Sequence, residues 1–130
     1  MKFQPDTLAG VNMINRHDAG RIVVGATAWT GSVVVPWAAP VQAWPVTAFE
    51  ALEPSHFDRL AELQPELVIF GSGSRMRFAP PALLRGLIER RIGVECMDTA
   101  AACRTYNVLV SERRSVVAAL ILETGAAGPG

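Results

Sequence analysis

The sequence has no excess of charge of either sign. Its 130 residues contain 12 Lys and Arg against 12 Asp and Glu, which gives a formal net charge of zero at pH 7. A generic nucleic-acid-binding domain would show a basic excess or a basic stripe, and a balanced chain has no long-range attraction to acidic surfaces. We therefore expect no nucleic-acid partner.

Cysteine is scarce, because the chain has only Cys96 and Cys103. Two thiols make neither a disulfide framework nor a four-ligand zinc set. We therefore expect no metal site, and we assign the chain to a reducing compartment, the cytoplasm of a bacterium. Residues 1–10 contain no charged segment followed by an apolar run, so no signal peptide is expected.

A long apolar span is also missing. Residues 22–49 carry no charge, and a membrane-spanning helix needs about 20 consecutive apolar residues. This stretch is, however, interrupted by two glycines and three prolines, which are Gly25, Gly31, Pro36, Pro40 and Pro45. Such interruptions are typical of short strands and turns, so we predict buried β-structure here and no membrane span.

The chain does contain enough apolar sequence to fold. Half of its residues are hydrophobic and 18% are charged, and a chain of this length buries roughly two-thirds of the surface that its unfolded form exposes. We predict a single domain over residues 1–130, with an ordered core at about residues 8–122. The Gly/Ala/Pro-rich end, residues 123–130, is predicted to be a flexible tail.

The first half of the chain is predicted to form short strands. Two of them, Val11–Arg16 and Arg21–Val24, flank residues that suit a hairpin loop, in which Gly20 can adopt a left-handed conformation. Further extended segments are predicted at Ser32–Val35 and Val41–Val46. These segments make up an N-terminal β-hairpin region.

The middle of the chain predicts a β-α-β crossover. The unbroken apolar run Leu67–Phe70 suits a strand buried on both faces. A helix is predicted from Pro80 to about Arg91, and Ile92–Met97 is predicted to be a second strand. Strands joined in this way pair in parallel with a right-handed crossover. The buried stripe of the helix is predicted to be Leu83, Leu84, Leu87 and Ile88.

Two further helices complete an α/β pattern. One is predicted at Ser55–Leu63, with Ser55 as its N-cap, and the other begins at Thr99, with Asp98 as its N-cap. Val116–Leu122 is predicted to be the closing strand. The chain is therefore predicted to have a three-layer α/β fold, in which helices cover a mixed central sheet.

One loop is a candidate binding site. The segment Gly71–Arg75 follows a buried strand and precedes a helix, and ligands of open α/β sheets bind beyond the carboxyl ends of the strands. Its glycines let backbone N–H groups converge on an anion, with charge from Arg75 or Arg77. The crossover brings the end of the next strand to the same edge. The predicted ligand-binding residues are Gly71, Ser72, Gly73, Ser74, Arg75, Asp98 and Thr99.

The same loop has a simpler interpretation. A lone Gly-x-Gly is a weak signal, and neither a P-loop lysine nor a full dinucleotide fingerprint follows it. Glycines are ordinary turn formers, and Asp98 is explained by helix capping. No cofactor is therefore expected, and the loop is either an anion site or only a turn.

The chain shows no recognisable catalytic set. His17 lies in the predicted hairpin and His56 near a helix start, and neither has a serine or cysteine at a motif spacing. Cys96 and Cys103 fall at predicted core positions, where cysteine packs as a small apolar residue. Hydrolytic and transfer chemistry usually needs an activated nucleophile or a metal. We therefore predict no catalytic residue, and we favour a binding protein over an enzyme.

Three tryptophans are candidate partner-binding residues. Trp29, Trp37 and Trp44 all lie in the uncharged stretch with its prolines. Exposed aromatic side chains anchor many protein interfaces, whereas packing against the sheet explains the same residues equally well. The sequence leaves both interpretations open.

Several strings match the pattern of one protein family. The central string runs from Pro65 to Gly73 and reads Pro-Glu-Leu-Val-Ile-Phe-Gly-Ser-Gly; the others are Gly93 to Thr99, Ala102 to Asn107 and Ala118 to Leu120, together with Trp44. They resemble a family of small domains of unknown function that includes mitochondrial complex I assembly factor three and the adipogenesis-associated domain proteins of animals. The resemblance covers roughly residues 8–122.

The resemblance implies a three-layer α/β fold, a protein partner and no established enzyme activity. The mitochondrial relative helps to assemble a respiratory complex. At the level of residues, the resemblance is limited to a shared loop, and it implies no role for the members of that loop, which are Gly71, Ser72, Gly73, Asp98 and Thr99. Two functions are therefore considered. The first is a non-enzymatic interaction or assembly module. The second is a small-molecule or anion-binding protein, enzymes included, that uses the loop.

Overall fold

A computed structural model describes residues 10–123 of the chain. Residues 1–9 and 124–130 lie outside the described part. The predictions that concern them, an absent signal peptide, an ordered core from about residue 8 and a flexible tail, therefore fall mainly on residues that the structure does not describe.

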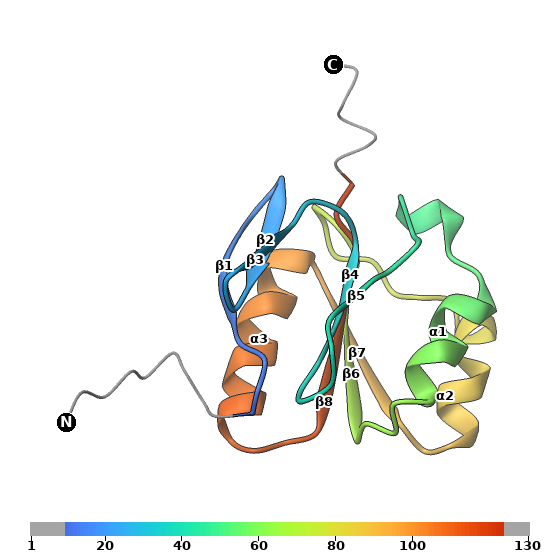
Figure 1. The fold of residues 1–130 in the computed structure, drawn as a ribbon. Coiled ribbons are helices and arrows are strands. Elements are labelled where there is room, and N and C mark those ends of the chain that lie inside the picture. Colours follow the sequence, from blue (N-terminus) through green and yellow to red (C-terminus); the bar gives the residue numbers. More distant parts are fainter. Residues whose placement is uncertain (1–9, 124–130) are drawn as a thin grey trace.

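A mixed sheet of five strands forms the centre of the molecule (Figure 1). The order of its strands is β5-β4-β8-β6-β7. Its strands are Gln42–Ala43 (β5), Val33–Pro36 (β4), Val116–Leu120 (β8), Leu67–Gly71 (β6) and Gly93–Met97 (β7). Strands β6, β7 and β8 are parallel to one another, and β4 runs antiparallel to both β5 and β8. The parallel pairing of β6 with β7, in register from Leu67 opposite Gly93 to Gly71 opposite Met97, confirms the predicted parallel arrangement of these two strands.

A second, antiparallel sheet of three strands is formed by the N-terminal region. Its strands are Ile14–Asp18 (β1), Arg21–Val24 (β2) and Thr27–Trp29 (β3). The hairpin between β1 and β2 was predicted, whereas β3 was not. This strand has only three residues and two of them are exposed, so it has no apolar alternation from which a strand could be inferred.

Helices cover both faces of the central sheet (Figure 1). The helices α1 (Pro54–Ala61) and α2 (Arg85–Glu89), with the 3₁₀ turns η1 (Phe49–Ala51) and η2 (Pro81–Leu84), lie on one side. The helix α3 (Thr99–Ser111) and the three-stranded sheet lie on the other. Each side has its own apolar core, one built around Phe57, Phe70 and Leu87, the other around Ile69 and Tyr106. The predicted three-layer α/β fold is therefore confirmed.

The helix α1 begins one residue earlier than predicted, and its N-cap is Glu53, not Ser55. The ring nitrogen Nδ1 of His56 accepts a hydrogen bond from the backbone N–H of Glu53 at 2.9 Å. Pro54 occupies the first helical position, where its fixed φ favours the helix and its missing N–H costs nothing. Ser55 therefore lies inside the first turn, and the capping box at this helix start joins Glu53 to His56.

The predicted helix from Pro80 to Arg91 is two shorter elements, the 3₁₀ turn η2 followed by α2. Leu84 and Leu87 are buried as predicted, but Ile88 is 56% exposed. A 3₁₀ turn advances three residues per turn, so the buried stripe changes phase where it meets the α-helix. This phase change turns Ile88 away from the core.

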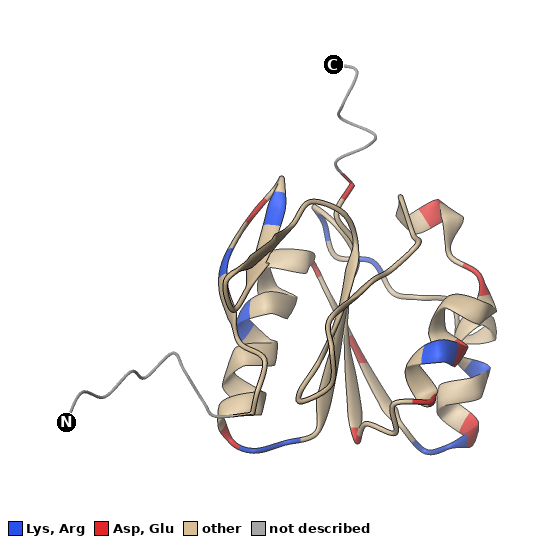
Figure 2. Cartoon of the chain, in the orientation of Figure 1, with Lys and Arg blue, Asp and Glu red and all other residues tan. Residues whose placement is uncertain are grey.

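Charged residues of both signs are interspersed over the helices and loops (Figure 2). Within residues 10–123, no helix is both long enough and apolar enough to cross a membrane. The uncharged stretch at residues 22–49 forms β2 to β5 and their connections, as its glycines and prolines suggested.

Candidate functional site

The predicted loop lies at the carboxyl end of β6, next to the start of α3. The N–H of Ser72 donates to the carbonyl oxygen of Met97 at 2.9 Å, and the N–H of Thr99 donates to the carbonyl oxygen of Gly73 at 2.9 Å. These bonds join the loop after β6 to the loop after β7. The structure thus brings together the two segments that the crossover was predicted to place at one edge.

Two backbone donors of the loop, the N–H groups of Ser72 and Gly73, are bonded inside the protein. The N–H of Gly73 donates to Thr99 Oγ1 at 2.9 Å, and the Thr99 hydroxyl donates to the carbonyl oxygen of Ile121 at 2.8 Å. The N–H of Ser72 is already bonded to Met97. An anion would have to displace these buried bonds to reach the N–H groups of Ser72 and Gly73.

The side chain of Ser72 also closes the loop and is fully buried. Its Oγ accepts a hydrogen bond from the N–H of Arg77 at 2.9 Å, and it lies 2.7 Å from the carbonyl oxygen of Arg75 and 3.1 Å from that of Met97. A hydroxyl has one proton to donate. Ser72 therefore has its hydrogen-bonding capacity used within the protein.

Both glycines of the loop are required by space. A Cβ at Gly71 would lie 3.0 Å from Thr99 Cα, so this glycine lets α3 approach β6. Gly73 has φ +104, and a Cβ there would lie 2.6 Å from Glu123 Oε1. Each glycine thus has a packing reason, which supports the interpretation of this segment as a structural turn.

The side chain of Arg77 hydrogen-bonds to the backbone of the loop, and only 14% of it is exposed. Its Nη2 donates to the carbonyl oxygen of Ser72 at 2.7 Å and to Glu123 Oε2 at 3.1 Å. Its Nη1 lies 3.4 Å from Glu50 Oε2, and its guanidinium carbon lies 4.5 Å from the centre of the Phe49 ring. The charge of Arg77 is therefore balanced by two carboxylates and is not free for an anionic ligand.

Asp98 acts as a helix cap, as predicted. Its Oδ1 accepts a hydrogen bond from the N–H of Ala101 at 2.8 Å. Of the predicted ligand-binding set, Ser74 and Arg75 alone are exposed. An anion site at this loop would depend on these two residues, and it stays a prediction.

The three tryptophans pack against the cores to different degrees. Trp44 is 2% exposed, its ring packs edge-on against Phe57 and Phe70, and its Nε1 donates to the carbonyl oxygen of His56 at 3.2 Å. It is therefore a core residue, and the partner-binding interpretation does not hold for it. Trp29 and Trp37 are half-buried. They stay candidate anchors only through their exposed parts.

Two exposed apolar residues flank Arg77, and sequence reasoning missed them. Phe78 is 74% exposed and Met76 is 42% exposed. Both lie in the loop between β6 and η2, where turn-forming residues drew attention to the backbone. The signal available in the sequence was Phe78 itself, an aromatic residue in a loop segment whose apolar residues show no periodicity that would place it in a core.

Cys103 and Tyr106 are buried in the core on the α3 side of the sheet. Cys103 is fully buried, and burial raises the pKa of its thiol to about 12. Burial also raises the pKa of Tyr106, whose hydroxyl lies 2.9 Å from the carbonyl oxygen of Asn12. Cys96 was predicted to be core but is only half-buried, because β7 is the outermost strand of the sheet. Within residues 10–123 there is no group of three His, Cys, Asp or Glu side chains that could hold a metal ion.

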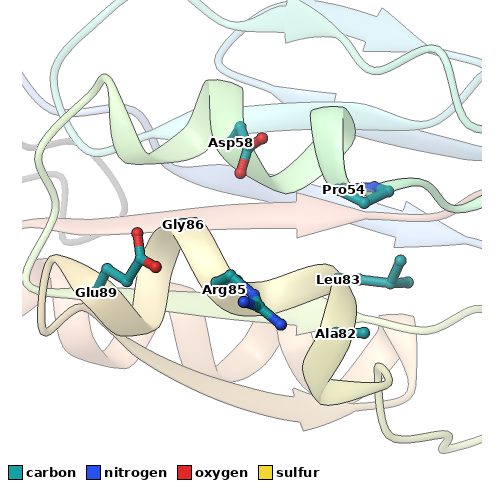
Figure 3. A pocket seen from close by; sticks show the side chains of 7 residues that line it. All are labelled: Pro54, Asp58, Ala82, Leu83, Arg85, Gly86 and Glu89. Atoms are coloured by element: carbon teal, nitrogen blue, oxygen red, sulfur yellow. The ribbon is translucent and has the colours of Figure 1, made fainter.

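A hollow of about 370 Å³ lies between α1 and the segment formed by η2 and α2 (Figure 3). Its lining residues are Pro54, Asp58, Ala82, Leu83, Arg85, Gly86 and Glu89. A Cβ at Gly86 would overlap the carboxylate of Asp58, so this glycine allows the two helices to approach closely. The hollow shares no lining residue with the loop at Gly71–Arg75 and does not extend the predicted site.

Comparison with known proteins gives a consistent family relationship. A family model described as "Protein of unknown function (DUF498/DUF598)" matches residues 14–121. The NADH dehydrogenase (ubiquinone) 1 alpha subcomplex assembly factor 3 of Xenopus tropicalis is 34% identical over 104 residues, which cover 78% of this chain and 56% of that protein. These matches confirm the family resemblance inferred from the sequence.

Two further similarities bear on the fold and on the range of relatives. A crystal structure of a protein from Bordetella parapertussis superimposes with a TM-score of 0.83 at 33% identity, covering 89% of this chain and 99% of that one. A "13 kDa major membrane protein" of Francisella tularensis is 29% identical over 72 residues, which cover 55% of this chain and 58% of that protein. The chain thus spans less than two thirds of the Xenopus and Francisella relatives.

Proposed function

The chain belongs to the protein family of unknown function DUF498/DUF598, and from this premise we propose that it is a non-enzymatic, assembly-factor-like module that acts by docking onto another protein. The observation that carries the proposal is the exposure of Phe78, which presents 74% of its surface to solvent on a loop held by partly buried hydrogen bonds.

The loop is suited to docking because its conformation is fixed before a partner arrives. Hydrogen bonds between Arg77 and Ser72 fix its backbone, while Met76 and Phe78, on either side of Arg77, are exposed to solvent. Ordering a flexible loop on binding costs affinity, and a preorganised loop avoids that cost. Burying a phenylalanine side chain contributes about 1.5–3 kcal/mol, which is the size of a typical interface anchor.

The chemistry of the loop indicates which partner surface it fits. Arg75 is exposed and makes no ion pair with any residue in the described part of the chain. A surface that receives Met76 and Phe78 would therefore bind best if it has an apolar pocket bordered by a carboxylate. Electrostatic complementarity of this kind contributes mainly to specificity and to the rate of association.

The relatives support a particular class of partner. The Xenopus relative is named as an assembly factor of an NADH dehydrogenase subcomplex, and the partner that we propose here is a subunit of such a respiratory complex. The Francisella relative is named as a membrane protein, which supports a docking partner that lies at a membrane.

The thiols support the proposed compartment. Cys96 and Cys103 are both free, and Cys103 lies fully inside the core. Unpaired thiols are ordinary in a reducing environment, so we propose that the module works in the cytoplasm.

The test is photo-crosslinking in native cells. A photoreactive phenylalanine analogue is placed at position 78 and, as a matched control, at position 108. Val108 is also exposed, at 55%, but it lies about two and a half turns along α3 from the loop. We expect position 78, and not position 108, to crosslink to a subunit of an NADH dehydrogenase.

Affinity for the purified subunit then decides whether the contact contributes to binding. We expect Phe78→Ala to weaken the complex by at least about fivefold, the loss that follows from removing an anchor worth more than 1 kcal/mol. Val108→Ala should leave the dissociation constant unchanged. Equal crosslinking at positions 78 and 108, or equal affinity of Phe78→Ala and the wild type, would contradict the proposal.

A further inference from the structure

The strand β7 forms an open edge of the central sheet. It pairs with β6 on one side, and no strand within residues 10–123 pairs with it on the other. An edge strand presents unpaired N–H and C=O groups and is a template on which another extended chain can add.

The register shows which backbone groups face outward. In a parallel pair, alternate residues direct both their N–H and their C=O toward the neighbouring strand. Met97 is one of these, because its carbonyl oxygen accepts from Ser72 at the end of β6. Glu95 and Gly93 therefore also face β6. Val94 and Cys96 face the open edge, and neither makes a further hydrogen bond within the described part of the chain.

The side chains around this edge are partly apolar. Val94 and Cys96 are half-buried and pack against the core beneath α1 and α2. Ile88 is 56% exposed on α2, which packs against β7. Glu95 points to the opposite face, is exposed, and makes no ion pair with residues 10–123. The edge has no proline to block an added strand.

Glu95 disfavours pairing between two copies of this chain. In the symmetric antiparallel register that pairs Val94 of one copy with Cys96 of the other, the symmetry axis passes between the two Glu95 residues. Like charges directly opposite each other on neighbouring strands are destabilising, and an opposite charge there is stabilising. The edge is therefore better suited to a different chain that carries a basic residue opposite Glu95.

We propose that the β7 edge binds an extended segment of a different protein, which adds as an antiparallel strand with an apolar–basic–apolar pattern. The outward N–H and C=O groups of Val94 and Cys96 bind its backbone. Its basic residue lies opposite Glu95, and its apolar residues continue the surface formed by Val94, Cys96 and Ile88. This interface is separate from the loop that carries Phe78.

The probe is the blocked peptide acetyl-Thr-Val-Lys-Val-Thr-amide, added at millimolar concentrations while backbone amide resonances are recorded. We expect the largest shifts at Val94 and Cys96. A matched peptide with Glu in place of Lys should bind less tightly, by up to about fivefold, because an opposite-charge pair across two strands is replaced by a like-charge pair. Absence of shifts at Val94 and Cys96 with the Lys peptide would overturn the proposal.

Two variants test the geometry and the charge separately. Val94→Pro removes an outward N–H together with part of the valine packing against the core, and proline is compatible with an edge strand whose N–H faces solvent; its dispersed amide spectrum should persist while peptide binding is lost. Glu95→Lys should reverse the order of affinity of the two peptides. Unchanged binding by Val94→Pro, or an unchanged order with Glu95→Lys, would also overturn the proposal.

A third variant separates this interface from the docking loop. Phe78→Ala leaves β7 intact, so it should bind the Lys peptide with the affinity of the wild type. Failure of the peptide experiment therefore leaves the docking loop standing, and failure of the crosslinking experiment leaves the β7 edge standing. Loss of peptide binding in Phe78→Ala would show that the peptide does not bind at the edge.

Discussion

The Nη2 atom of Arg77 donates a hydrogen bond to the carbonyl oxygen of Ser72 across 2.7 Å. The Ser72 hydroxyl in turn accepts from the N–H of Arg77 at 2.9 Å. Arg77 is the donor in both bonds, once from its side chain and once from its backbone, and Ser72 is the acceptor in both. These two bonds fix the backbone of the glycine-rich segment, and Met76 and Phe78 lie exposed on either side of Arg77.

Replacement of Arg77 by alanine should destabilise the protein. The variant leaves the carbonyl oxygen of Ser72 and the Glu123 carboxylate without their donors, and loss of one partner of a buried polar pair costs about 1–3 kcal/mol. Urea unfolding of Arg77→Ala measures the loss. Arg75→Ala is the matched control, because Arg75 is exposed, and its free energy of unfolding should stay within about 0.5 kcal/mol of the wild type. Equal stability of the two variants would contradict the proposed role of Arg77.

Gly73 should not tolerate a side chain. Its φ of +104 is unfavourable for alanine, and a Cβ would lie 2.6 Å from Glu123 Oε1 and 2.9 Å from Arg77 Nη2. We expect Gly73→Ala to lower the free energy of unfolding by about 1–3 kcal/mol. Gly31→Ala is the control, because a Cβ at Gly31 meets nothing within 4 Å. A Gly73→Ala variant as stable as Gly31→Ala would show that the loop can rearrange freely.

Local patterns predicted the elements whose sequence signals are strong. The apolar run at Leu67–Phe70 and the helix after it determined the β-α-β crossover, and Asp98 was identified as a cap from its position before a helix. The 3₁₀ turn at η2 was not predicted, because the leucine spacing fits a 3₁₀ turn and an α-helix nearly equally well. The resulting phase change accounts for the exposure of Ile88.

The candidate site could be predicted only in part, because its contacts join residues far apart in the chain. The sequence identified Gly71 and Gly73 but not that Arg77 would be neutralised by Glu50, 27 residues away, and by Glu123, 46 residues away. The position of β7 at the edge of the sheet is likewise a property of strand order, and no residue in β7 encodes it. The exposure of Cys96 follows from that order.

The N-cap of α3 provides a test that separates a carboxylate's charge from its geometry. Asp98 Oδ1 accepts the N–H of Ala101 at 2.8 Å, and loss of an N-cap side chain costs about 0.5–2 kcal/mol. We expect Asp98→Ala to show this loss in chemical denaturation. Asp98→Asn keeps an acceptor at the same position and should retain most of the stability. Equal losses in both variants would mean that the charge, not the hydrogen bond, stabilises the helix.

Stability should fall at alkaline pH because of Cys103. Burial raises the pKa of its thiol from 9.0 to about 12, so between pH 9 and 12 the unfolded chain has lost a proton that the folded chain still holds. The stability from this difference is fully present below pH 9 and is lost as the pH rises through that window, by up to about 1.4 kcal/mol per pH unit.

Urea unfolding of the wild type and Cys103→Ala at pH 8 and pH 10.5 checks this expectation. Removing the thiol should remove its share of the pH dependence. Val110→Ala is the matched control, because Val110 is also buried in the same core but does not titrate; it should lower stability at both pH values and leave their difference unchanged. The half-buried thiol of Cys96 should react with a thiol reagent in the folded protein, whereas Cys103 should react only at the rate of unfolding. An equal pH dependence in the wild type and Cys103→Ala would show that the buried thiol does not contribute to alkaline unfolding.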